Sequence, residues 1–203
     1  MTEWTLLDYG AGNLHSLARA LERAGARTRT TTAAADLIDA DIAVLPGVGA
    51  FGPVMQNLAG VADELRQRHK AKRPILAICI GQQVLHKGSD EAPDAAGLGI
   101  LPGHVMRLPA SAGKVPHMGW NTLDIARPDP ALEGVATGSH VYYVHSFASV
   151  PGPDCLASTT YGLRFAALVR RGNTVGTQFH PEKSGAVGAR ILANLVRQME
   201  GLA

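Results

Sequence analysis

The sequence predicts an α/β fold with a mostly parallel central sheet that is flanked by helices and extended by antiparallel strands. In about the first ninety residues, short apolar segments alternate with segments of helical periodicity, as in a doubly wound parallel sheet. Residues 104–161 carry strand-like pieces between Gly, Pro and Asp clusters, which favours antiparallel strands. Candidate reactive residues fall where the predicted parallel strands end, the edge at which active sites of such sheets collect.

The N-terminal elements are predicted in the order strand, helix, strand, strand, helix. Residues 5–7 form a strand that ends at Asp8, and a glycine-containing loop then leads to leucines at helical spacing at positions 14, 17 and 21. Residues 26–31 and 42–45 form the next two strands, the second of which ends before Pro46. A single helix is then predicted from apolar residues at helical spacing, namely Val54, Leu58, Val61 and Leu65.

Two further strands and a closing helix complete the prediction. Residues 74–80 are apolar and uncharged, as in a strand buried on both faces, and a helix is predicted to begin at Gly81. Residues 174–179 have strand character and precede a proline that cannot continue a ladder. One face of the last helix is formed by Ala189, Leu192, Val196 and Met199. Residues 1–203 are expected to form one domain.

The composition is ordinary for a soluble globular protein, with 46% hydrophobic and 18% charged residues and a formal net charge of +2. The 19 Lys and Arg residues are scattered, so nucleic acid is not an expected partner; the densest basic stretch, residues 66–73, is expected to be an exposed helix end. No apolar run reaches about 18 residues and the N-terminus lacks a basic flank, so we expect a cytoplasmic protein with no membrane contact. No Cys/His cluster has zinc spacing, and neither a metal nor a cofactor is expected.

Cys79 stands at the end of the apolar stretch, directly before Ile80 and Gly81. A strand that turns sharply into a helix, with its last side chain at the corner, has the geometry of a nucleophile elbow. The free N–H groups at the helix start favour a thiolate over a thiol. The alternative is a buried core cysteine, as most cysteines in apolar runs are, and Cys79 alone does not decide between the two.

His180 and Glu182, about a hundred residues downstream, supply the groups that a thiol nucleophile needs. His180 ends the predicted strand, and a bend at Pro181 can bring the carboxylate of Glu182 back to the imidazole. Cys79, His180 and Glu182 would then be nucleophile, base and orienting carboxylate. A surface histidine in a turn and a solvated glutamate capping the last helix are the alternatives for this segment.

Taken together, these segments resemble a class I, triad-type glutamine amidotransferase. Further strings are similar to one branch of that family, the glutaminase subunits of imidazole glycerol phosphate synthase. They occur in order and at family-like spacing, and comprise residues 8–14 (Asp-Tyr-Gly-Ala-Gly-Asn-Leu), 46–51 (Pro-Gly-Val-Gly-Ala-Phe), 115–121 (Val-Pro-His-Met-Gly-Trp-Asn), 144–146 (Val-His-Ser) and 176–184 (Gly-Thr-Gln-Phe-His-Pro-Glu-Lys-Ser). Two positions depart from the family pattern: Ala77 replaces the usual elbow glycine, and Gln82 replaces a common hydrophobic residue. We expect a slightly more open elbow that keeps its activity.

The resemblance implies a flavodoxin-like fold and hydrolysis of L-glutamine to glutamate and ammonia through a cysteinyl thioester. Cys79 is the implied nucleophile, His180 the base and then the acid, and Glu182 the group that orients His180. The oxyanion hole is implied at Gly47, Val48 and Ile80, and the glutamine contacts are implied at Gln83, His145, Ser146 and Phe147. Core or solvated roles stay open for the glutamine contacts, and residues 46–49 would also fit a plain strand-to-helix turn.

The resemblance also implies a partner that consumes the ammonia. This partner is the cyclase subunit of the synthase. It is a (β/α)₈ barrel that forms a heterodimer with the glutaminase, receives ammonia through an internal passage and makes imidazole glycerol phosphate in histidine biosynthesis. The implied interface residues are His117, Met118, Trp120, Asn121, Tyr142 and Lys183, with core packing as the alternative for Trp120. Rival functions are a triad glutaminase that serves another synthase, such as the one making pyridoxal phosphate, and a non-catalytic binding subunit of the same fold.

Overall fold

The computed structural model describes residues 2–10, 14–47 and 49–202, and its main sheet has eight strands in the order β2-β1-β3-β4-β12-β11-β10-β7. Five neighbouring strands run parallel, namely β2 (Arg27–Thr31), β1 (Glu3–Leu7), β3 (Ile42–Leu45), β4 (Ile75–Ile78) and β12 (Thr174–Thr177). Three strands continue the sheet in antiparallel pairing, namely β11 (Leu163–Arg171), β10 (Cys155–Tyr161) and β7 (Asp124–Ile125). The predicted fold class is confirmed.

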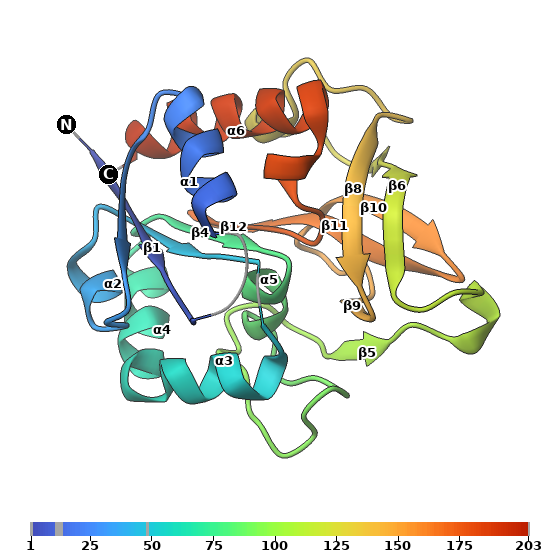
Figure 1. Cartoon of the computed structure of the whole chain (residues 1–203), viewed down its shortest axis with the longest axis horizontal. Helices are drawn as coiled ribbons and strands as arrows, with labels where there is room; N and C mark the ends of the chain where they lie inside the picture. The colour runs from blue at the N-terminus through green and yellow to red at the C-terminus, as the bar shows by residue number, and fades with distance from the viewer. Residues whose placement is uncertain (1, 11–13, 48, 203) are drawn as a thin grey trace.

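Helices cover both faces of the parallel part of the sheet (Figure 1). One face packs against α1 (Leu14–Arg23) and α6 (Gly185–Glu200), and the other against α2 (Asp36–Asp39), α3 (Phe51–Leu58), α4 (Ala62–Lys70) and α5 (Ile80–Val84). Short 3₁₀ helices lie in the connections, namely η1 (Ala59–Val61), η2 (Ala110–Ala112), η3 (Pro130–Leu132) and η4 (Pro181–Lys183). Within the described ranges, no helix combines the length and apolarity needed to cross a membrane.

The central strands are buried on both faces because their side chains alternate between two hydrophobic clusters. In β3, Ile42 and Val44 face the cluster that includes residues of α1 and α6. Ala43 and Leu45 face the cluster that includes residues of α3 and α4. The same alternation holds in β4, so the C-terminal end of this strand is packed on both faces. Cys79 follows directly at that end.

The strands predicted between residues 104 and 161 only partly join the main sheet. β10 and β7 extend it, but β5 (Val105–Arg107) pairs with β9 (Phe147–Ser149), and β6 (His117–Thr122) pairs with β8 (His140–His145), in two separate sheets. β8 docks on the segment after β12: the His180 N–H donates to the Tyr142 carbonyl at 2.9 Å, and the Tyr142 N–H donates to Ser184 Oγ at 2.9 Å. A loop thus satisfies backbone groups that a neighbouring strand would otherwise pair.

Several local boundaries differ from the sequence prediction. The helix predicted across residues 54–65 is divided into α3, η1 and α4 around Ala59 and Gly60, since glycine weakens a helix interior. The strand predicted up to Ile80 ends at Ile78, and the helix begins at Ile80, one residue before the predicted start at Gly81. The elements α2 and β11 are not predicted from the sequence.

The basic stretch at residues 66–73 is the end of α4, as predicted, and Lys70 and Lys72 are exposed there, but Arg68 and Arg73 turn inward. Arg68 is only 3% exposed, and its guanidinium donates to the backbone carbonyls of Leu37, Ile38, Asp41 and Pro74. Arg73 donates to the carbonyls of Ile38, Asp39 and Ala40. The two arginines satisfy carbonyl groups around the end of α2 that have no helical partner.

Candidate active site

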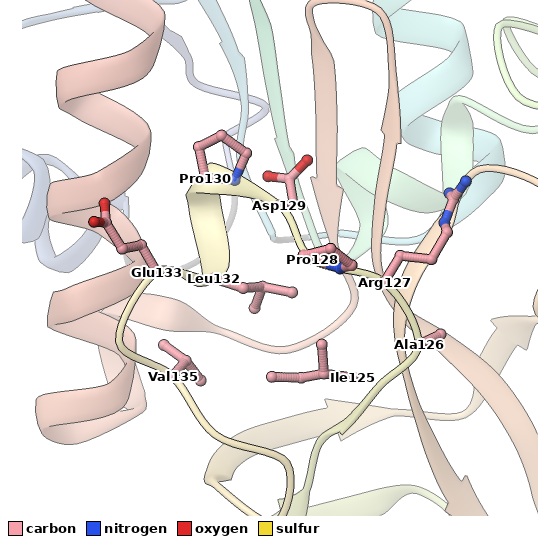
Figure 2. A pocket seen from close by; sticks show the side chains of 9 residues that line it. All are labelled: Ile125, Ala126, Arg127, Pro128, Asp129, Pro130, Leu132, Glu133 and Val135. Carbon is pink, nitrogen blue, oxygen red and sulfur yellow. The ribbon is translucent and has the colours of Figure 1, made fainter.

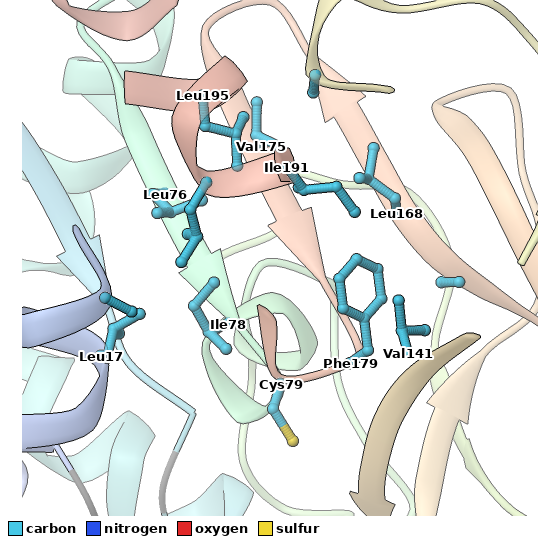
Figure 3. Close-up of a cluster of buried hydrophobic side chains, with 14 of the residues drawn as sticks. Leu17, Leu76, Ile78, Cys79, Val141, Leu168, Val175, Phe179, Ile191 and Leu195 are labelled. Carbon is cyan, nitrogen blue, oxygen red and sulfur yellow. The ribbon is translucent and has the colours of Figure 1, made fainter. Parts of the chain in front are cut away.

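Cys79 sits on a strained elbow between β4 and α5. Its backbone has φ 49° and ψ −107°, a conformation that side-chain-bearing residues rarely adopt, and its N–H donates to the Thr177 carbonyl at 2.6 Å. A β-carbon at Gly81 would lie 2.2 Å from the Leu45 carbonyl oxygen, so only glycine lets α5 pack this closely against β3. Figure 3 shows the Cys79 sulfur pointing away from the apolar side chains of Ile78 and Phe179. Cys79 therefore lies at the edge of the core and does not fill it.

His180 reaches Cys79 because β12 is the parallel neighbour of β4, with Thr177 opposite Ile78. A β-carbon built on Gly47 would lie 2.8 Å from His180 Cε1 and 3.0 Å from the Cys79 β-carbon. The two side chains thus border the same point of the loop after β3. The structure brings together residues that are about a hundred positions apart in the sequence.

Glu182 returns to His180 through the one-turn helix η4. Its Oε1 lies 2.7 Å from His180 Nδ1, and both side chains are buried. Burial alone would lower the pKa of His180, but the charges of Cys79 and Glu182 outweigh it and raise the pKa to about 10. Within the described residues His180 Nε2 makes no aligned hydrogen bond, so Cys79 and His180 are close neighbours whose alignment is still loose.

Among the described residues, two polar groups besides His180 contact the Cys79 sulfur. Nε2 of Gln178 lies 3.5 Å from Sγ, and the Val144 carbonyl oxygen lies 4.0 Å from it. Gln178 is not among the predicted site residues, although it lies in the Gly-Thr-Gln-Phe-His-Pro-Glu string. Strand alternation would have indicated it, because Gln178 and His180 are two residues apart at the end of β12.

A cavity of about 200 Å³ opens beside the sulfur. It is lined by Gly49, Cys79, Ile80, Gln83, Glu91, Pro116, Val144, His145, Ser146 and Phe147. All four predicted glutamine contacts are in this lining. Glu91 and Pro116 are additions that the sequence does not indicate, since Glu91 lies in the long connection after α5 and Pro116 lies before β6. Gln83 also donates to the Phe147 carbonyl at 2.8 Å.

Backbone donors for an oxyanion are available on two sides of this cavity. Ile80 begins α5 and lines the cavity, and its N–H has no carbonyl partner within the helix. Gly47 borders Cys79, and Gly49 has φ 106° and lines the cavity. Val48, which was also predicted here, lies outside the described residues, as do residues 11–13 of the first family-like string.

His117 and Asn121 point into the molecule. His117 is 3% exposed, and its Nδ1 lies 3.0 Å from His145 Nε2, while Asn121 Nδ2 lies 3.3 Å from His117 Nε2. Burial lowers the pKa of His117 to about 4, and burial together with nearby positive charge lowers that of His145 to about 3, so both rings are neutral near pH 7. This inward orientation gives His117 a structural role inside the chain and leaves it no surface for direct contact with a partner.

The other predicted interface residues lie on elements that contact one another, with Met118 and Trp120 on β6, Tyr142 on β8 and Lys183 on η4, and these four residues are here called the patch. Met118 is 62% exposed and Trp120 is 55% exposed, and Trp120 makes an edge contact with Tyr142. Lys183 is exposed on η4, directly after Glu182. Because Tyr142 also bonds to the backbone of His180, the patch lies against the segment that carries His180 and Glu182. Core packing is thereby excluded for the Trp120 ring.

A larger cavity of about 770 Å³ lies elsewhere, in the connection between β7 and η3 (Figure 2). Its polar groups are already engaged: both Asp129 oxygens bond to Arg170, at 2.7 and 2.9 Å, and Arg127 donates to the Cys155 carbonyl. The walls contributed by Ile125, Leu132 and Val135 are apolar. Its lining includes no thiol and no histidine, and its carboxylates, Asp129 and Glu133, are paired with Arg170 and Arg197, so its size does not make it the reactive site.

The two departures from the family pattern are both buried. Ala77 lies in β4 opposite Gly176 of β12 and Leu45 of β3. Gln82 donates to the Ala166 carbonyl at 3.5 Å, and its Oε1 has no partner within the described ranges. Across those same ranges, no three His, Cys, Asp or Glu side chains are grouped as metal ligands would be.

The sequence is similar to a known family over nearly its whole length: the family "Glutamine amidotransferase class-I" matches residues 5–199. Among curated proteins, imidazole glycerol phosphate synthase subunit HisH of Methanosarcina barkeri is 43% identical, over 97% of this chain and 98% of its own length. The HisH subunit of a Synechococcus species is 47% identical, over 94% and 91% of the two chains. An Arabidopsis thaliana protein, imidazole glycerol phosphate synthase hisHF, is 44% identical, and the match covers 33% of its length.

Solved structures show the same fold at lower identity. A GMP synthase protein of Thermoplasma acidophilum superposes with a TM-score of 0.76 at 20% identity, covering 99% of this chain and 95% of that one. PurLQS of Thermotoga maritima gives a TM-score of 0.75, also at 20% identity, covering 98% and 99%.

Proposed function

The chain belongs to the class I glutamine amidotransferase family, and from that premise we propose that it is the glutaminase subunit of an imidazole glycerol phosphate synthase, acting in histidine biosynthesis. The observation that carries the proposal is the convergence of the Cys79 elbow with the His180–Glu182 pair beside a cavity. The identity of 43–47% to HisH subunits, against 20% to the solved GMP synthase and PurLQS proteins, favours this synthase over the others.

The reaction follows from the three side chains. The Cys79 thiolate attacks the carboxamide carbon of glutamine, and protonated His180 gives its proton to the departing nitrogen, so that ammonia and a thioester form. Neutral His180 then takes a proton from water, which attacks the thioester and releases glutamate. Glu182 keeps Nδ1 of His180 protonated and stabilises the imidazolium, as the carboxylate of a triad does. The sum is glutamine plus water giving glutamate plus ammonia.

The cavity supplies complementary groups for the rest of the substrate. The oxyanion is bound by the N–H of Ile80, the residue after Cys79, and by a backbone N–H of the loop after β3, whose Gly47 borders Cys79. Glu91 lines the cavity with a carboxylate, one oxygen of which caps α3 by accepting the Phe51 N–H at 2.8 Å. The other oxygen suits the α-ammonium group of glutamine. Residues 144–147 line the same cavity and contact the α-amino and α-carboxylate end of glutamine.

Ammonia leaves toward a cyclase partner that docks on the patch of Met118, Trp120, Tyr142 and Lys183. Exposed Trp and Met side chains are typical of interface cores, and this patch lies against the His180–Glu182 segment. In the Arabidopsis relative the matched region is one third of a longer chain, which fits a fused cyclase. The partner is a (β/α)₈ barrel in a heterodimer. In this proposal residues 1–203 act as one domain, and the unpaired Cys79 and Cys155 suit the reducing cytoplasm.

Labelling with a glutamine-mimicking electrophile, 6-diazo-5-oxo-norleucine, tests the proposal. We expect one adduct per chain, located at Cys79 by peptide mass spectrometry, with Cys155 as the internal control. Glutamate release is expected to be lost in Cys79→Ser and kept in Cys155→Ser. A chain that remains unlabelled at Cys79 in the presence of the cyclase partner is a binding module and not a glutaminase.

A further inference from the structure

A chain of side-chain amides leads from a backbone carbonyl to the Cys79 sulfur. The Phe147 carbonyl accepts a hydrogen bond from Gln83 Nε2 at 2.8 Å, and the same nitrogen donates to Gln178 Oε1 at 3.1 Å. Nε2 of Gln178 then lies 3.5 Å from the sulfur. Both glutamines are buried, Gln178 completely, so no bulk water competes for these bonds.

The Phe147 carbonyl fixes which group donates and which accepts in every hydrogen bond of this series. A backbone carbonyl only accepts, so the atom of Gln83 that faces Phe147 is the amide nitrogen. A side-chain amide nitrogen only donates, so the atom of Gln178 that faces Gln83 is the oxygen. The NH₂ group of Gln178 is left facing the sulfur. The assignment of nitrogen and oxygen, often ambiguous in glutamines, is here dictated by the hydrogen bonds.

The Phe147 carbonyl is itself held in place from a second side. Nδ1 of His145 lies 2.9 Å from it and must donate, since the carbonyl accepts. His145 Nε2 is then an acceptor, and it receives the Nδ1–H of His117 at 3.0 Å. The inward-pointing histidines therefore anchor the carbonyl at which the amide chain begins.

We propose that Gln178 donates a hydrogen bond to the Cys79 sulfur that favours the thiolate over the thiol, and that Gln83 is the positioning residue that holds Gln178 in the donating orientation. An N–H donor binds the charged sulfur more strongly than the neutral one. The Val144 carbonyl would favour the thiol but is farther away, at 4.0 Å. This inference deepens the proposed function, on which it rests, and gives Gln83 a role other than its expected contact with glutamine.

The other groups around the sulfur differ from Gln178 in kind. His180, which directly precedes η4, carries charge and is paired with Glu182 on its far side. Neutral His145 of β8 and the carboxylate of Glu91 line the cavity beside the sulfur. His180 loses its stabilising charge when it deprotonates, whereas an amide donates at any pH. The contributions of His180 and Gln178 to the stability of the thiolate can therefore be separated in a pH profile.

The test is the rate at which iodoacetamide alkylates Cys79 in the complete chain between pH 5 and pH 10, with the adduct located by mass spectrometry. In Gln178→Met, we expect the midpoint of the profile to rise by about one pH unit and the rate at pH values below that midpoint to fall about tenfold, which is the lower end of the contribution of a hydrogen bond to a charged group. Glutaminase kcat should fall while KM changes little, because Gln178 does not line the cavity.

Gln82→Met is the matched control, since Gln82 is an equally buried glutamine on α5 whose amide bonds to Ala166 and not to the sulfur. Its alkylation profile should be unchanged. An unchanged profile in Gln178→Met, or an equal shift in both variants, would overturn the inference. If the unsubstituted chain is not labelled at Cys79 by the glutamine mimic, it is the proposed function that fails.

A measurement on the unsubstituted chain keeps the inference testable if Gln178→Met does not fold. The side-chain amide resonances of Gln178 in a ¹⁵N-labelled sample should shift over the pH range in which alkylation becomes fast, and the shift should be absent in Cys79→Ser. Resonances that do not change over that range overturn the hydrogen bond to the thiolate.

Discussion

Oε1 of Glu182 lies 2.7 Å from Nδ1 of His180, in a turn that separates the two residues by a single proline. The contact leaves Nε2 of His180 as the nitrogen available to the sulfur. It also supplies one of the two negative charges that raise the pKa of His180 to about 10. The Glu182 carboxylate therefore both orients the His180 ring and stabilises its positive charge, and the two effects can be tested separately.

Glu182→Gln is expected to lower glutaminase kcat by about a hundredfold or more, because the amide no longer stabilises the imidazolium and can bind the wrong tautomer of His180. Folding should be retained, since the side chains have the same shape. The measurement is steady-state glutamate release in the presence of the cyclase partner. The exposed Glu133→Gln is the control and should behave like the unsubstituted chain, and activity of Glu182→Gln within about threefold of that chain would remove Glu182 from the triad.

Stability should fall as the pH rises above neutrality because of His180. Its pKa is raised in the folded chain from an ordinary value of 6.5 to about 10, so the folded state holds this proton more tightly than the unfolded state. The contribution is fully present below about pH 6.5 and is lost as the pH rises toward about 10. Urea unfolding at pH 6.5, 8 and 9.5 measures it. In His180→Gln the decline should be smaller, and an equal decline in both chains would refute the assignment.

Stability should also fall in acid because of the neutral pair His117 and His145. Their pKa values in the folded chain lie at about 4 and about 3, below the ordinary 6.5, so the unfolded state binds protons more readily. Their contribution is present above about pH 6.5 and is lost as the pH falls through about 4. Unfolding experiments between pH 7 and pH 4 should show a shallower slope in His117→Gln. The exposed His140→Gln is the control, and its slope should match that of the unsubstituted chain.

Gly81→Ala tests the packing that holds the elbow. Its β-carbon would lie 2.2 Å from the Leu45 carbonyl oxygen, so α5 must move away from β3. We expect a loss of about 2 kcal/mol or more in the free energy of unfolding, together with a large loss of kcat as Cys79 shifts. Gly60→Ala, where a β-carbon meets no atom within 4 Å, is the control. Equal stability in the two variants, measured by urea unfolding, would contradict this account of the elbow.

Arg68→Met tests the buried guanidinium. The substitution leaves the carbonyls of Leu37, Ile38, Asp41 and Pro74 without this donor, and we expect a loss of about 3 kcal/mol in the free energy of unfolding. Arg27→Met removes a mostly exposed arginine and should change stability by less than about 0.5 kcal/mol. A loss in Arg68→Met no larger than that in the control would mean that the buried bonds contribute little.

The parallel half of the fold is predictable because its signals are local. Apolar strands buried on both faces and helices with leucines at regular spacing identify β1, β3, β4 and α1 with small boundary errors. The middle of the chain is less predictable, because the partner of an antiparallel strand is set by long-range docking. β8 pairs with β6 and with the loop after His180, and no spacing within residues 104–161 encodes that contact. The burial of Arg68 is not predictable for the same reason, since its acceptors are backbone carbonyls supplied by other segments.

The sequence by itself determined the candidate reactive residues: a thiol at a strand end, a histidine and a glutamate around a proline, and glycines at turns, because residue type and local spacing fix these features. Only the tertiary structure decided how they meet. The pairing of β12 with β4 brings His180 to Cys79, and the fold turns His117 inward, leaves Trp120 exposed and places the Gln178 amide at the sulfur. The physical reason is that side-chain direction and contact depend on the packing of segments distant in sequence, which no local pattern contains.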